Sequence, residues 1–141
     1  WESNAIVRYL CARENRLYPS DLHTRFTAEQ WMDWQQTNLN RASGTAFVQW
    51  IRTPEAQRDP ALIAQSVAAT EPLLDLLDQR LQKQAFVAGE QMSMADLPIA
   101  CEVHRWWGLP QNRPHWPHLE RWYAHMRKHP GSAGVLDLPL S

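Results

Sequence analysis

The sequence lacks the features that would place its 141 residues in a membrane or nucleic-acid-binding class. It has no apolar run long enough to span a bilayer and no signal peptide, so we expect a soluble cytoplasmic protein. It also lacks an excess of either charge, because the formal net charge is -1 and the isoelectric point is about 6.6. A nearly neutral chain gives no electrostatic reason to expect binding to nucleic acid or to a membrane.

Motifs of several common chemistries are also missing. The sequence contains no G-x-S-x-G, P-loop, G-x-G-x-x-G or C-x-x-C motif. Its two cysteines, Cys11 and Cys101, both lie in apolar helical patterns, so we expect buried free thiols. No segment of useful length alternates apolar and polar residues as a half-buried strand would. We therefore predict an all-α fold.

The segment 94–107 is predicted to be a buried central helix, because apolar residues fall on nearly all its sides. Ser93 stands three residues before Asp96, which is the spacing of a capping box. In this box the Ser93 hydroxyl accepts the N–H of Asp96, and the Asp96 carboxylate accepts the N–H of Ser93. A buried helix start needs such partners, so we predict a structural role for both residues.

Other helices are expected to pack around this central one. The first is short and needs a packing partner for its apolar stripe. Thr27 to Gln30 matches a second capping box, and Pro72 predicts a kink rather than a break. The first expected helix is 4–13, with Ser3 as its N-cap and an apolar stripe formed by Ala5, Ile6, Tyr9 and Leu10. The other expected helices run from 27 to about 51, from Asp59–Pro60 to Leu81, and from 117 to about 129.

Glu2 and Ser3 are the sharpest candidates for ligand binding. Ser3 stands at a helix start, where outward N–H groups and the helix dipole favour a carboxylate. Glu2 beside it offers an anion for an ammonium group, so the pair could hold the zwitterionic end of an α-amino acid. The alternative is that Ser3 only caps its own helix while Glu2 is solvated.

Trp31, Trp34 and Asn38 share a strip at helical spacing. Such a strip is either part of the core or one wall of an apolar ligand pocket beside the first helix.

Most other titratable side chains are expected to be structural or solvated. The paired histidines have spacings that could share a metal, but no third ligand lies nearby in sequence, so we expect no metal site. His104 is expected to be hydrogen-bonded within the core. The remaining pairs, expected at the surface, are His115 with His118, His125 with His129, Glu29 with Asp33, and Asp75 with Asp78.

Several segments together resemble the cytosolic glutathione transferases, covering essentially the whole chain in the same order. Residues 2–10 (ESNAIVRYL) resemble the stretch that joins the last strand to the third helix of the family's thioredoxin-like domain. Residues 86–98 resemble its helix-capping motif in the all-helical C-terminal domain, and 117–123 resemble a late helix. Trp31 to Trp34 (WMDW) is similar to bacterial members near the theta and beta classes.

The resemblance implies a division of the chain into three parts. Residues 1–14 would be the end of a thioredoxin-like domain, 15–26 a linker, and 27–141 the all-α C-terminal bundle around its buried central helix. Because the sequence opens on Trp1 rather than on methionine, we expect it to be part of a longer protein.

The resemblance also implies a homodimeric enzyme that uses glutathione as co-substrate and adds its thiolate to a small hydrophobic electrophile. Ser3 would bind the γ-glutamyl carboxylate and Glu2 the ammonium group. The helix at 28–51 would supply part of the dimer contact and, with Trp31, Trp34 and Asn38, one wall of the electrophile pocket. The thiol-activating residue would lie upstream of Trp1, so we expect no catalytic residue in this chain and no activity from it alone.

Two alternatives stay open. The same fold serves as a non-enzymatic helical interaction module in translation factors and synthetase complexes. The same superfamily also includes glutathione-dependent disulfide reductases and dehalogenases. The presence of Glu2 and Ser3 favours an enzyme, because a scaffold has no use for a group that binds an amino acid.

Overall fold

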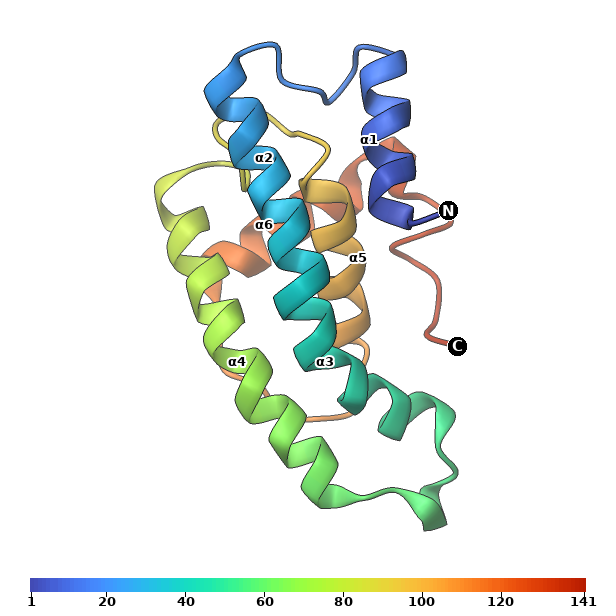
Figure 1. Ribbon diagram of the computed structural model, residues 1–141. Helices are drawn as coiled ribbons and strands as arrows, with labels where there is room; N and C mark the ends of the chain where they lie inside the picture. The colour runs from blue at the N-terminus through green and yellow to red at the C-terminus, as the bar shows by residue number, and fades with distance from the viewer.

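The computed structural model describes all 141 residues, and it consists of helices and loops (Figure 1). The predicted all-α class is confirmed, since the only β-type pairing is an isolated bridge between Phe86 and Gly89. None of the helices combines the length and apolar content that crossing a membrane requires. The α-helices are α1 (Ser3–Arg13), α2 (Leu22–Trp34), α3 (Asn40–Phe47), α4 (Pro60–Lys83), α5 (Asp96–Trp107) and α6 (Pro117–Lys128).

One continuous helical rod extends from α2 through α3 (Figure 1). Two π-helical turns interrupt its regular hydrogen bonding, η1 (Gln35–Leu39) between α2 and α3 and η2 (Val48–Arg52) after α3. The predicted start of this rod at Thr27 is wrong. Asp21 is the N-cap and accepts the backbone N–H of Thr24 at 2.8 Å, while the Thr27 hydroxyl donates back to the His23 carbonyl within the helix.

Helix α4 returns alongside this rod (Figure 1). Asp59 caps it by accepting the backbone N–H of Ala61 at 2.8 Å, and Pro60 occupies the first helical position, as the sequence predicts. The helix continues through Pro72 to Lys83, so the expectation of one helix rather than two is confirmed.

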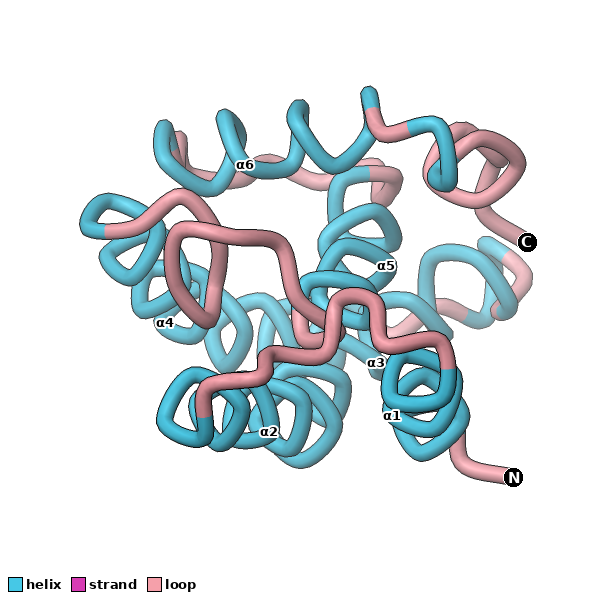
Figure 2. Tube along the Cα trace, turned by 90° about the horizontal axis from the view of Figure 1, so that it is seen from above, coloured by secondary structure: helices cyan, strands magenta, loops and turns pink.

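Helix α5 lies at the centre of the bundle. Seen from above in Figure 2, it has α6 on one side and the α1 and α2–α3 layer on the other. Its inward side chains are buried against apolar residues from the neighbouring helices. The fully buried apolar side chains of this core include Met32, Leu39, Leu74, Leu77, Leu81, Ile99, Leu119 and Trp122.

The start of α5 is held by the carboxylate of Asp96, which is fully buried. This carboxylate accepts the backbone N–H of Ser93 at 2.8 Å and its hydroxyl at 3.1 Å. It also accepts the backbone N–H of Val87 at 3.1 Å and the indole N–H of Trp122 at 3.0 Å. Burial raises the pKa of the Asp96 carboxyl, and these hydrogen bonds oppose the rise.

The other half of the expected capping box is wrong. The Ser93 hydroxyl accepts the backbone N–H of Ala95 at 3.4 Å rather than that of Asp96. The N–H of Asp96 instead donates to the backbone carbonyl of Ser93, because a tight turn precedes the helix and α5 begins only at Asp96.

A carboxylate of another helix caps α6. Asp78 of α4 accepts the backbone N–H groups of His118 and Leu119, each at 2.8 Å. Asp75, one turn earlier, accepts the indole N–H of Trp116 at 2.7 Å. Asp75 is exposed, as expected, whereas Asp78 is half-buried, and both carboxylates fix α6 on α4.

We predict that Asp96→Ala lowers the free energy of unfolding by about 3–5 kcal/mol, because it leaves several buried donors without an acceptor. Urea denaturation followed by circular dichroism measures this loss. Asp59→Ala is the matched control, since it removes an exposed cap and should cost only about 1 kcal/mol. Equal losses in the two variants would contradict the role given to Asp96.

Candidate functional site

The tip of α1 exposes the two residues predicted to bind a ligand. Glu2 occupies the N-cap position and Ser3 is the first helical residue, so the expectation that Ser3 caps this helix is wrong. No side chain caps this helix end. Glu2 has φ 65° and ψ 103°, a backbone conformation that non-glycine residues rarely adopt and that concentrates at functional sites. The tip thus offers backbone donors, a hydroxyl and a carboxylate to a ligand.

Behind this tip, the side chain of Asn4 is buried against the rod. Its amide group donates to the Met32 carbonyl at 3.0 Å and to the Gln35 side-chain oxygen at 3.1 Å. The sequence gives no signal for this role, because nothing in the local pattern separates Asn4 from an ordinary polar residue of a first turn.

One turn further along α1, Arg8 forms ion pairs with Glu29 and Asp33 of α2. Burial alone would lower the pKa of Arg8, but its hydrogen bonds and its pairing with the two carboxylates raise it. The expected solvated position is confirmed for Asp33, which is mostly exposed, and wrong for Glu29, which is half-buried. Together with Asn4, this cluster supplies polar contacts between α1 and the rod, beside the apolar Val7 and Cys11, which pack on the core.

The apolar stripe of α1 faces away from the bundle. Its large members are exposed, with Ile6 at 49%, Tyr9 at 62% and Leu10 at 42% of their full accessible surface. No element of this chain therefore covers the stripe that the sequence analysis expects to pack on a partner.

A cleft of about 280 Å³ opens beside Ser3, between α1, η1 and α5. The rod contributes the amides Gln35, Gln36 and Asn40 to its lining, and α5 contributes Leu97 and Cys101. Helix α5 also contributes the ion pair of Glu102 and Arg105, so the cleft has amides on the rod side and both apolar and charged groups on the α5 side.

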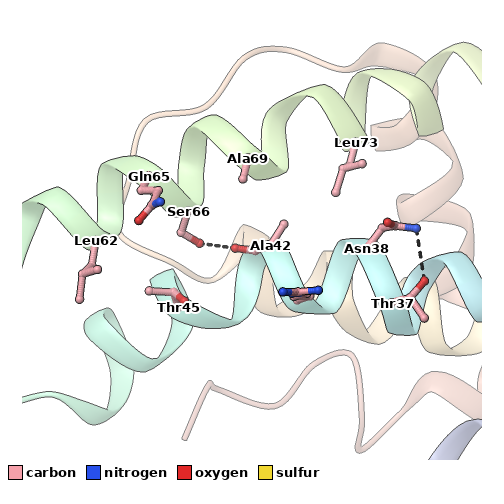
Figure 3. A pocket seen from close by; sticks show the side chains of 10 residues that line it. Thr37, Asn38, Ala42, Thr45, Leu62, Gln65, Ser66, Ala69 and Leu73 are labelled. Atoms are coloured by element: carbon pink, nitrogen blue, oxygen red, sulfur yellow. Dashed lines mark hydrogen bonds between the residues drawn. The ribbon is translucent and has the colours of Figure 1, made fainter.

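Of the three residues predicted as one electrophile wall, Asn38 lines a groove to which neither tryptophan contributes. Trp31 and Trp34 pack edge to face, with ring centroids 4.9 Å apart. Asn38 is exposed and lies in a separate groove between the rod and α4 (Figure 3). The physical reason is η1, since a π-turn adds a residue to the helical repeat and rotates Asn38 away from the strip that i, i+4 spacing predicts.

The histidines are dispersed over the chain. No group of three or more His, Cys, Asp or Glu side chains is arranged to hold a metal ion. His115 contacts Glu120 at 3.0 Å, and His125 packs edge-on against Phe86. The prediction of a hydrogen-bonded His104 is confirmed. Its two ring nitrogens lie 2.7 Å from the Tyr123 hydroxyl and 2.9 Å from the Leu138 carbonyl.

The two thiols differ in exposure. Cys11 is buried as predicted, whereas Cys101 is exposed at the cleft, so its predicted burial is wrong. Desolvation by neighbouring groups raises the pKa of the Cys101 thiol, and the Glu102 carboxylate raises it further. A raised pKa keeps this thiol protonated near neutral pH, which does not suit an activated nucleophile.

We predict that iodoacetamide modifies Cys101 alone in the native protein and Cys11 only after unfolding. The rate should be low near neutral pH and should increase as the pH rises past about 9, because only the thiolate reacts. Mass spectrometry of the modified peptides over a pH series measures this, with Cys101→Ser as the control. A rate already at its maximum near pH 7 would contradict the raised pKa.

Comparison with known proteins shows which family this chain resembles. A family model described as "Glutathione S-transferase, C-terminal domain" matches residues 41–130. Glutathione S-transferase GstB of Escherichia coli (strain K12) is 34% identical over all of this chain and 69% of its own length. Glutathione S-transferase theta-1 of Homo sapiens is 34% identical over 72% of this chain and 45% of its own length.

A solved structure of the theta class glutathione S-transferase from Xanthomonas axonopodis pv. citri, with glutathione bound, superposes with a TM-score of 0.96. It is 37% identical in sequence, and the match covers all of this chain and 69% of that one.

Proposed function

The chain belongs to the cytosolic glutathione transferase family, and from this premise we propose that the tip of α1 binds the γ-glutamyl end of glutathione. Ser3 binds the carboxylate with its hydroxyl and the N–H groups of the first helical turn. Glu2 binds the ammonium group. The observation that supports this assignment is the exposed helix start, which no side chain of the protein caps.

The enzyme is a glutathione transferase, and its reaction divides between binding and thiol activation. The α1 tip supplies binding and orientation of glutathione, which bring the thiol next to the electrophile. Activation requires a group that lowers the pKa of the glutathione thiol. We propose that this group belongs to a thioredoxin-like domain, of which residues 1–14 are the end, with 15–26 as the linker and 27–141 as the all-α domain.

The exposed stripe of α1 supports this division. Ile6, Tyr9 and Leu10 form an apolar face with no partner in this chain. A sheet packed on this face would bury it and bring its own groups close to Ser3.

The cleft beside Ser3 is the site we propose for the electrophile. Leu97 and Pro98 supply apolar surface, and Gln35, Gln36 and Asn40 border it. This proposal replaces the wall of Trp31, Trp34 and Asn38, because the groove that Asn38 lines includes neither tryptophan. A small hydrophobic electrophile suits the size and the mixed lining of the cleft.

We further propose that the protein is a cytoplasmic homodimer that uses the groove between the rod and α4 (Figure 3). This groove measures about 430 Å³ and is lined by Asn38, Arg41, Ala69 and Leu73, among others. Leu62 at one end is exposed, so the groove offers apolar surface with a polar edge, as dimer interfaces do.

We predict that Ser3→Ala raises the glutathione dissociation constant of the full-length protein about tenfold, because a hydrogen bond to a charged group is lost. Glu2→Ala should have a similar effect. Isothermal titration with glutathione measures both, and Ser20→Ala, on an exposed loop, is the matched control. Unchanged affinity in both tip variants would contradict the site.

We predict that Ala69→Arg converts the dimer to a monomer, because a long charged side chain fills the groove and loses solvation there. Sedimentation velocity measures the change. Leu76→Arg is the matched control, since Leu76 is exposed on α4 outside the groove and its replacement should leave the dimer intact. A dimer that persists in Ala69→Arg would place the interface elsewhere.

A further inference from the structure

We propose that Asn4 is a positioning residue for glutathione binding, which acts by fixing the tip of α1 on the π-turn of the rod. This inference rests on the proposed function, because it concerns how Glu2 and Ser3 are held. Asn4 borders the cleft, but both donor positions of its amide are used by Met32 and Gln35, so it offers no hydrogen bond to a ligand in this proposal. It sets the place of the residues that do.

The side chain of Asn4 is buried and forms two hydrogen bonds of fixed direction. Its side chain is 8% exposed, and its amide nitrogen uses both of its donor positions, toward the Met32 carbonyl and the Gln35 side chain. Both acceptors lie where α2 passes into η1. Two hydrogen bonds to two different groups fix the direction of a side chain more tightly than apolar packing does.

The π-turn provides the place for this amide. In η1 the N–H of Asn40 reaches the Gln35 carbonyl, a bond from i+5 to i, so the turn is wider than in a regular α-helix. The Met32 carbonyl, one turn earlier, accepts the N–H of Gln35 and has a second lone pair, which takes the Asn4 amide. The hydrogen bonds of the Asn4 amide therefore connect the first turn of α1 to the π-turn of the rod.

The hydrogen bond between Asn4 and Gln35 also lies at the cleft. Gln35 is buried, accepts from Asn4 and lines the cleft beside Ser3. Loss of the Asn4 amide would release Ser3, its neighbour in the chain, and one side chain of the cleft wall together. We therefore infer that Asn4 sets the position of the helix tip relative to the cleft in which the electrophile is proposed to lie.

A second set of contacts, the ion pairs of Arg8, should keep α1 on the bundle when Asn4 is substituted. Arg8 pairs with Glu29 and Asp33 one turn away from the tip, at a more exposed position. Removing Asn4 should consequently loosen the tip without detaching the helix. Removing Arg8 should weaken the packing of the helix and leave the tip in place.

The experiment compares Asn4→Ala with Arg8→Gln in the full-length enzyme, with glutathione and a small activated aryl halide as substrates. For Asn4→Ala we expect the KM for glutathione to rise about tenfold, with kcat at saturating glutathione within about twofold of the parent. For Arg8→Gln we expect less than about a twofold change in this KM, with a lower melting temperature. Hydrogen exchange of residues 3–6 should be faster in Asn4→Ala alone.

Equal changes of the glutathione KM in the two variants would overturn the inference, because Asn4 would then act only through general packing. If Asn4→Ala does not fold, Asn4→Ser serves instead, since its single hydroxyl donor can satisfy at most one of the two acceptors. A rise of about threefold in the glutathione KM at constant kcat supports the inference, and no rise overturns it.

The variant Ser3→Ala separates this inference from the proposed function. If Ser3→Ala weakens glutathione binding but Asn4→Ala does not, the glutathione site stands and the positioning role of Asn4 is wrong. If Ser3→Ala leaves glutathione binding unchanged, the proposed site is wrong, and the inference about Asn4 is wrong with it.

Discussion

The carboxylate of Asp96 is the interaction on which the rest of the structure depends most. It accepts donors from the loop before α5, at Ser93 and Val87, and from α6, at Trp122. Because it is fully buried, every one of these donors would lack a water substitute if the carboxylate were lost. The orientation of α5, and with it the apolar wall of the cleft at Leu97, therefore depends on one side chain far from any ligand.

The regular parts of the fold could be predicted from sequence because their signals are local. Asp59 and Pro60 open α4 as expected, and the spacing of Leu119, Trp122 and Met126 is that of the buried face of α6. The rod shows where local signals fail. The sequence predicts its start at Thr27, but the rod begins five residues earlier at Leu22, with Asp21 as its N-cap. The π-turn at Gln35–Leu39 breaks the helical period that the pocket prediction assumes, and no residue in the sequence marks it.

The candidate site could be predicted only in its exposed half. The residues Glu2 and Ser3 stand out because their chemistry suits a ligand and lies together in sequence. The residues that hold the tip in place do not stand out, because the partners of Asn4 and Arg8 lie more than twenty residues away in sequence, on α2 and η1. A carboxylate on a helix looks solvated until the partner helix is known, which is why the pattern alone does not show the partners of Glu29, Asp33, Asp75 and Asp78.

Helix α1 departs from the usual arrangement of a bundle helix, since Asn4 and Arg8 share its inward side with Val7 and Cys11 while its large apolar residues Ile6, Tyr9 and Leu10 are exposed. Apolar packing is tolerant of small shifts, whereas hydrogen bonds and ion pairs fix distance and direction. Hydrogen bonds and ion pairs on the cleft side therefore suit a helix whose tip must hold a small ligand in a fixed position. Its apolar side is then left free for a larger partner, such as a sheet, whose packing supplies stability rather than orientation.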